Sequence, residues 1–383
     1  MLNVAVIGIG NTGNQIAALA ADKLKIPVAA INSSEKDLGT IPNSVPKFVI
    51  SDADKTSRGA GKNRKLAQTY LKASVQNLVG SNAEFRNIFK GIELILVVSS
   101  TGGGTGSGAS LIMSQILDDV YRNAKVIPIG VLPVETEAKS SHVNSLEYLT
   151  ELYNVLPKTT TYMLYDNDRY ADLPSYKINQ TVNNEVIKDI EVLTCQHNSS
   201  TPYDSIDEED MKRLISFPGR LALARLEDIK EKDIDIEGEL IKRIKNNAHT
   251  DIQRDRKITA TGIISDLSQY LSEEFNNHIP KVREFIGDPD HDFNHIIIHD
   301  DRKIMNNVYL IMAGLSPIND KIAKIKDRID QIDESQQVRE DESVLSDIDV
   351  AKLSSDITSK DAPKNESEDT SVNLKDIFGR FNL

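Results

Sequence analysis

The chain has 383 residues, enough for two or three domains of ordinary size, and its 45 basic and 58 acidic residues give a formal net charge of −13. An acidic chain is a poor general binder of nucleic acid, because phosphate contacts require Lys and Arg. The single cysteine, Cys195, excludes a disulfide framework and a cysteine-ligated zinc site. The sequence shows no signal peptide and no apolar run of ~18 residues, so we expect a cytoplasmic protein without a membrane span.

Apolar strands and amphipathic helices alternate over the first half of the chain. We expect strands at 4–7, 28–32, 92–98, 126–131 and 162–165, and helices at 15–25, 63–79, 109–120, 144–153 and 178–193. Strands that alternate with helices predict an α/β fold, with a mostly parallel sheet covered on both faces.

The second half has a different pattern and ends in an acidic segment. We expect residues 295–299 and 307–315 to form paired strands, followed by a helix over 318–332. The stretch 334–372 holds eleven acidic and four basic residues and no aromatic residue. Such a composition cannot bury enough apolar surface to become ordered, which predicts a disordered acidic linker.

The last eleven residues, 373–383, form an amphipathic peptide. Leu374, Ile377, Phe378 and Phe381 recur at the spacing of one helical face. We favour a recognition helix for a groove on a partner protein. The alternative is that this helix docks on the core of its own chain.

A first glycine turn, Gly8-Ile-Gly10-Asn-Thr-Gly13, lies between a strand and a helix. The pattern is compatible with a plain turn, with a dinucleotide site, or with another phosphate-binding loop at a helix N-terminus. A dinucleotide site is disfavoured because the second strand ends in Ile31-Asn32-Ser33, without the acidic residue that would hold a ribose hydroxyl.

A second glycine turn follows the strand at 92–98 and reads Thr101-Gly102-Gly103-Gly104-Thr105-Gly106-Ser107-Gly108. Without Cβ atoms, consecutive amides can surround a phosphate, and the hydroxyl groups add donors. A flexible linker is disfavoured because the turn connects two core elements. No Lys-Ser/Thr pair follows, so the turn is not a Walker A loop. A short basic segment, 59–64, opens the helix at 63–79 and could meet a terminal phosphate, although a solvated helix start is the simpler interpretation.

The segment Gly102–Gly108, GGGTGSG between a strand and a helix, resembles the signature loop of the tubulin/FtsZ superfamily of GTPases. The resemblance covers roughly residues 2–330. It implies a GTP-binding Rossmann-like domain over 1–177, a central helix and following loop over 178–204, and a smaller α+β activation domain over 205–333. It also implies GTP or GDP as the ligand. Mg²⁺ is inferred from phosphate chemistry, since the sequence shows no cage of carboxylates.

The resemblance assigns nucleotide contacts residue by residue. The phosphate-binding residues it implies are Gly10, Asn11, Thr12, Gly13, Asn14, Gln15, Gly59, Ala60, Gly61, Lys62, Thr101, Gly102, Gly103, Gly104, Thr105, Gly106 and Ser107. Glu137 is placed on the ribose, and Asn167 lies in a loop similar to the family's Asn-Asp-Arg loop. Asn184 and Glu185 are placed at the guanine edge, where an amide or carboxylate can bind donors that adenine lacks.

The hydrolytic acids implied by the resemblance are Asp207 and Asp210, in a segment similar to the synergy loop of FtsZ. The alternative is the acidic first turn of a helix. The central helix spans roughly 25 Å, so these acids are too distant to act on their own nucleotide. They could act on the nucleotide of a neighbour in a head-to-tail filament.

Departures from FtsZ, such as Ser141 in place of an arginine, favour a resemblance to the TubZ group of the superfamily. That resemblance implies a filament that segregates plasmid or phage DNA through a DNA-bound adaptor held by the C-terminal tail, with no direct membrane contact. The alternatives are FtsZ-like cell division, a non-catalytic GTP-switched scaffold, and an NAD-dependent oxidoreductase.

Overall fold

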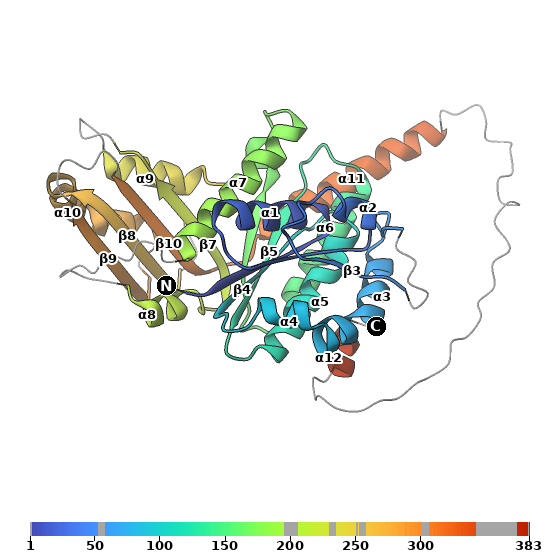
Figure 1. Ribbon diagram of the computed structural model, residues 1–383. Helices are drawn as coiled ribbons and strands as arrows, with labels where there is room; N and C mark the ends of the chain where they lie inside the picture. The colour runs from blue at the N-terminus through green and yellow to red at the C-terminus, as the bar shows by residue number, and fades with distance from the viewer. Residues whose placement is uncertain are drawn as a thin grey trace, which may run out of the picture.

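The computed structural model describes residues 2–52, 58–194, 206–229, 235–249, 252, 258–287, 289–299, 306–341, 374–381 and 383. Within these ranges one sheet of ten strands runs through the molecule, in the order β3-β2-β1-β4-β5-β6-β7-β10-β8-β9 (Figure 1). The strands of the first half are β1 (Val4–Ile9), β2 (Val28–Asn32), β3 (Lys47–Val49), β4 (Leu94–Ser100), β5 (Lys125–Leu132) and β6 (Thr161–Asp166). They are all parallel.

Helices cover both faces of this parallel part, as its continuous apolar strands require. The helices are α1 (Gly10–Lys23) and α7 (Ser175–Leu193) on one face, and α3 (Arg64–Val75), α5 (Thr105–Val120) and α6 (Lys139–Asn154) on the other (Figure 1). Short helices α2 (Glu35–Leu38) and α4 (Ala83–Ile88) complete this half. Alternate residues of β1 enter the two cores: Val4 and Val6 face α1, while Ala5, Ile7 and Ile9 face α5.

The far end of the sheet is built from β7 (Gly219–Leu226), β8 (Ala260–Ser268), β9 (His291–His299) and β10 (Asn307–Leu315). Here β10 lies antiparallel between β7 and β8, and β9 pairs parallel with β8. The helices α9 (Ile236–Lys245) and α10 (Gln269–Ile286) close a separate apolar core over this part. The prediction that residues 295–299 and 307–315 pair with each other is therefore wrong, because β8 lies between them. Neither β7 nor β8 was predicted.

Several element boundaries also differ from the expectation. Helices α1 and α5 begin within the glycine turns, at Gly10 and Thr105, instead of after them. The expected helix at 63–79 ends at Val75 and continues as a π-helical turn, Gln76–Ser81. The helix expected at 318–332 is α11 (Asn319–Asp341), so the predicted start of the linker at 334 is wrong. Residues 342–372 of the expected linker lie outside the described residues.

The C-terminal helix α12 (Leu374–Arg380) packs against α5. Ile377, Phe378 and Phe381 are buried in the apolar cluster that also contains the inner faces of α3 and α5. The ammonium group of Lys72 lies 5.7 Å from the centre of the Phe378 ring. The apolar stripe is thus covered by its own chain, which was the alternative to the partner-facing helix we favoured.

None of the helices in the described ranges combines the length and the apolar content needed to cross a bilayer.

Candidate nucleotide-binding site

The strand order reverses between β1 and β4, because the chain moves outward from β1 in one direction and from β4 in the other. The loops that leave the carboxyl ends of these two strands therefore diverge and open a crevice, the usual ligand position in such sheets. Helix α1 follows β1 and helix α5 follows β4, so both helices direct their N-termini to this crevice.

Both helix N-termini are suited to an anion. Neither α1 nor α5 has a side chain of the described residues that caps it, and neither has an acidic residue in its first turn. The first amides of a helix lack partners within the helix and carry the positive end of its dipole. Two such termini at one crevice form a phosphate-binding arrangement.

The crevice holds a cavity of about 690 Å³, a size typical of small-ligand sites. Fourteen of the residues that the sequence assigned to the nucleotide line it: Gly10, Asn11, Thr12, Gly59, Ala60, Gly61, Lys62, Gly102, Gly103, Gly104, Thr105, Gly106, Glu137 and Asn167. The two glycine turns, the 59–62 segment and the loop at 133–137 thus converge, although they are far apart in the sequence.

Close backbone contacts explain why glycines stand in these turns. Gly10 has a φ of +75°, and a Cβ atom there would lie 2.9 Å from the amide nitrogen of Gly106. A Cβ atom on Gly104 would lie 2.8 Å from Cα of Lys62. Larger residues would force the three loops apart. Around Gly103, by contrast, the position of a Cβ atom has no neighbour within 4 Å among the described residues.

Asn144 of α6 ties two of the loops together. Its amide nitrogen lies 2.9 Å from the carbonyl oxygen of Lys62, 3.2 Å from that of Gly102 and 3.1 Å from that of Gly103. The ammonium group of Lys62 donates to the Ser141 hydroxyl at 2.8 Å. The bracing role of Asn144 was not predicted, because its side chain acts on loops of distant sequence.

Five more of the assigned residues do not line this cavity. They are Gly13, Asn14, Gln15, Thr101 and Ser107. The Thr101 hydroxyl contacts the carbonyl of Val131 and the hydroxyl of Ser145, and the Ser107 hydroxyl donates to the carbonyl of Gly103. These side chains shape the loop from beneath.

Unpaired amide groups line the cavity at two positions, and another is buried in α1. Among the described residues, buried Asn14 has no partner for either polar atom of its side chain, and neither has Nδ2 of Asn32 or Oδ1 of Asn167. Asn32 and Asn167 line the cavity. A buried polar group without a partner costs about 1–3 kcal/mol, so these groups favour a polar ligand that would bind them.

The residues expected at the guanine edge are bound to other side chains of the protein. Asn184 accepts a hydrogen bond from Lys23 at 2.6 Å, and Glu185 is paired with Arg225 of β7. Neither lines the cavity, whereas Ser175 and Asn179 of the same helix do. The predicted helix began three residues late, at 178.

Asp207 and Asp210 lie near the amino end of β4, at the end of the strands opposite the cavity. Together they form a capping box at the N-terminus of α8 (Glu208–Leu214): Asp207 accepts from the amide of Asp210 at 2.8 Å, and Asp210 from that of Asp207 at 3.4 Å. Lys212 of α8 binds Glu93 at 2.8 Å, immediately before β4. Since β4 has seven residues, these acids are separated from the glycine turn after β4 by roughly 23 Å.

The described residues contain no group of three or more His, Cys, Asp or Glu side chains that could hold a metal ion. Asp37 and Glu137 are the acidic residues that line the described cavity. Mg²⁺ commonly binds through substrate phosphates, water and one or two carboxylates, so this lining fits a metal that arrives with a nucleotide.

Comparisons with known proteins agree with this arrangement. Residues 3–174 match the model of the tubulin/FtsZ family, GTPase domain. TubZ of Clostridium botulinum C phage is 24% identical over 220 residues, which cover 57% of this chain and 56% of that protein. FtsZ of Mycoplasmopsis pulmonis is 27% identical over 195 residues, which cover 49% of this chain and 47% of that protein. The matches span about half the length of these relatives.

Solved structures show the same fold over most of the chain. The tail-truncated TubZ of Clostridium botulinum phage c-st superimposes with a TM-score of 0.69 at 19% identity, covering 88% of this chain and 98% of that one. CetZ of Methanosaeta thermophila also gives a TM-score of 0.69, at 21% identity, covering 89% and 94%.

The structure is therefore that of an α/β protein with a crevice suited to an anion at the carboxyl ends of its parallel strands. Residues 3–174 match the GTPase-domain model of the tubulin/FtsZ family, and the chain has the fold of these tubulin-like proteins, as its glycine loop predicted.

Proposed function

We propose that this chain is a GTPase that binds GTP and GDP in the crevice between β1 and β4. The observation that carries the proposal is the meeting of two uncapped helix N-termini at one cavity lined by glycine turns. The phosphates would accept hydrogen bonds from the turns around Gly10 and Gly103. Arg58 and Lys62 add positive charge to the rim.

We infer that the base lies toward α7. Asn179 lines both the phosphate cavity and a neighbouring cavity of about 1100 Å³, which Gln15, Tyr176 and Asn183 also line. Oδ1 of Asn183 has no partner among the described residues, and the Tyr176 side chain is 68% exposed. An amide oxygen can accept from the N1–H and 2-amino groups of guanine, and an exposed ring can stack on a purine.

We propose that hydrolysis is completed between subunits. The carboxylates of Asp207 and Asp210 lie near the amino ends of the parallel strands, opposite the cavity. A head-to-tail neighbour would therefore bring its own two aspartates to the bound GTP. There they would orient the attacking water, while Mg²⁺ would neutralise phosphate charge. The TubZ of Bacillus thuringiensis serovar israelensis has been solved as a GTPγS-form protofilament, which supports this mode of assembly.

Phosphate release measured against protein concentration tests the proposal. With GTP we expect the rate per subunit to rise cooperatively above a critical concentration, in parallel with light scattering, and with ATP we expect little release. A rate per subunit that is independent of concentration, or equal for both nucleotides, contradicts the proposal.

We further propose that the filament moves plasmid or phage DNA through a DNA-bound adaptor, with FtsZ-like cell division as the alternative. The negative net charge supports an indirect contact with DNA. The site itself does not favour an oxidoreductase that uses NAD, since β2 ends in Asn32. Because the apolar face of α12 is buried on its own domain, an adaptor that binds this face would have to displace the helix.

Removal of residues 373–383 tests the role of the tail. We expect GTP turnover to stay within about twofold, because the side chains of α12 do not line the cavity. We expect adaptor binding to be lost and the melting temperature to fall by a few degrees, as the surface of α5 becomes exposed. Equal adaptor binding by the truncated and full-length chains contradicts the role.

A further inference from the structure

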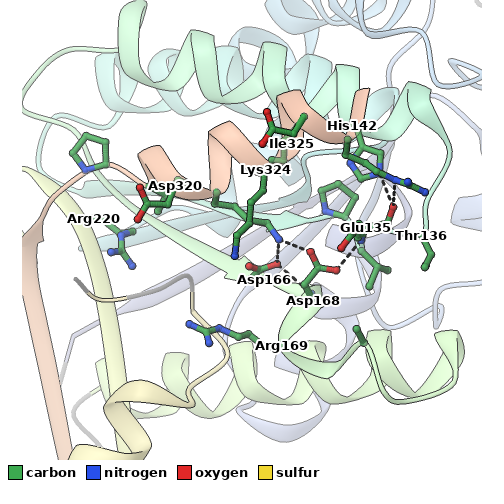
Figure 2. A pocket seen from close by; sticks show the side chains of 18 of the residues that line it. Glu135, Thr136, His142, Asp166, Asp168, Arg169, Arg220, Asp320, Lys324 and Ile325 are labelled. Carbon is green, nitrogen blue, oxygen red and sulfur yellow. Dashed lines mark hydrogen bonds and ion pairs between the residues drawn. The ribbon is translucent and has the colours of Figure 1, made fainter. Parts of the chain in front are cut away.

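A second cavity, of about 740 Å³, lies beneath α11 and next to the nucleotide site. The two cavities share Val134 and Thr136 of the loop at 133–137, so this loop is the wall between them. Figure 2 shows the charged side chains that gather there, with Asp166 and Asp168 on one side and α11 on the other.

Lys321, in the first turn of α11, is held between these two carboxylates. Its Nζ lies 2.8 Å from Oδ1 of Asp166 and 2.5 Å from Oδ2 of Asp168. The Lys321 side chain is only 12% exposed. Burial opposes its charge, but the two aspartates outweigh this effect and hold the pKa of Lys321 above its ordinary value.

The second oxygen of Asp168 extends this contact to the wall between the cavities. Oδ1 of Asp168 accepts a hydrogen bond from the amide of Glu135 at 2.7 Å. The carbonyl oxygen of Glu135 lies 3.1 Å from Nε of Arg328, also on α11, and 3.1 Å from Nε2 of His142. Both backbone polar groups of Glu135 are thus fixed by α11. Arg328 binds the carbonyl group directly, and Lys321 holds the amide group through Asp168.

Asn167, between the two aspartates, faces the other cavity. It lines the nucleotide site, and its Oδ1 has no partner among the described residues. Asp166 accepts from the amide of Asp168 at 3.1 Å and so caps the short helix η2 (Asn167–Tyr170) that begins at Asn167. The position of Asn167 therefore depends on the two carboxylates that Lys321 binds.

We propose that Lys321 is a positioning residue of the nucleotide site, which rests on the proposed GTP-binding function. Through Asp166 and Asp168 it holds Asn167 and the loop at 133–137 against the sugar side of the nucleotide. Without Lys321, the buried Asp166 and the partly exposed Asp168 lose their shared cation, and their repulsion drives helix η2 and the loop at 133–137 apart. The phosphate turns belong to other elements and keep their geometry.

Lys321→Met tests the proposal in the full chain, with Lys324→Met as the matched control. Lys324 lines the same cavity from the same helix but forms no ion pair within the described residues. For K321M we expect about a tenfold weaker Kd for GDP and a similarly higher KM for GTP, while kcat changes less than about twofold. K324M should match the wild type. Lys321→Arg should restore most of the GDP affinity.

Further outcomes distinguish a failure of the positioning role from a failure of the proposed GTP-binding function. A wild-type chain that binds no GDP refutes the proposed function itself. Wild-type affinity in a folded K321M chain overturns the positioning role. Should K321M fail to fold, the milder Asp168→Asn variant, which keeps an acceptor for the amide of Glu135, takes its place and should weaken GDP binding several-fold. Unchanged affinity in D168N also overturns the proposal.

Discussion

Replacing Asp210 by asparagine is expected to lower GTP turnover by at least about 100-fold while GDP binding stays at the wild-type level. A carboxylate that orients or deprotonates water contributes about this factor, and an amide cannot replace it. The amide oxygen can still accept from the backbone of Asp207, so the capping box of α8 is kept. Steady-state phosphate release and GDP titration measure the two quantities.

The neighbouring Glu209→Gln variant is the control for this change. Glu209 is exposed on the same helix turn and binds Lys212 at 2.9 Å, so its replacement removes the same charge from the same surface. We expect E209Q to keep its turnover within about twofold. If D210N also retains turnover, the two aspartates only cap α8, and hydrolysis does not depend on them.

Replacing Gly103 by alanine is expected to weaken nucleotide binding by about 100-fold without destabilising the fold. The added methyl group meets no protein atom within 4 Å among the described residues, yet Gly103 lines the cavity where we place the phosphates. The methyl group would keep a phosphate from the turn, and the loss of two charge-assisted hydrogen bonds accounts for such a factor. GDP titration and thermal unfolding of the nucleotide-free chain measure the two effects.

Alanine variants of two other glycines serve as controls for this prediction. At Gly104 a methyl group would collide with the backbone of Lys62, so Gly104→Ala should lower both stability and binding. At Gly80, distant from the site, a methyl group has open space, and Gly80→Ala should change neither. Wild-type GDP affinity in G103A would mean that the phosphates do not lie on this turn.

The fold and the meeting of the glycine turns at one cavity were predictable because both depend on local sequence. Buried strands followed by glycine turns place those turns at one edge of a parallel sheet, wherever the strands stand in the order. The sequence alone therefore predicts that the turns of Gly10 and Gly103 lie at one end of the sheet. The far end of the sheet was not predictable in this way. The position of β8 between β9 and β10 depends on pairing between segments that are distant in the sequence, which local patterns do not indicate.

The residues that α7 contributes to the cavities depend on which face of the helix is turned toward them. Asn184 was assigned by resemblance to a family motif, but it lies on the face of α7 that meets Lys23, whereas Asn179 lines the cavity. The network around Lys321 was equally hidden, since it joins residues about 150 positions apart in the chain. The stripe on α12 predicted a helix with one apolar face but not the surface that covers it.

The central claim is that two subunits complete one active site, and mixing two inactive variants tests it most directly. The D210N variant keeps an intact cavity, and the G103A variant keeps both aspartates. An interface is therefore complete where the cavity of a D210N subunit meets the aspartates of a G103A subunit. We predict that an equimolar mixture above the assembly concentration regains roughly a quarter of the wild-type GTP turnover, the share of such interfaces in random filaments. Turnover no higher than the sum of the separate variants would contradict the claim.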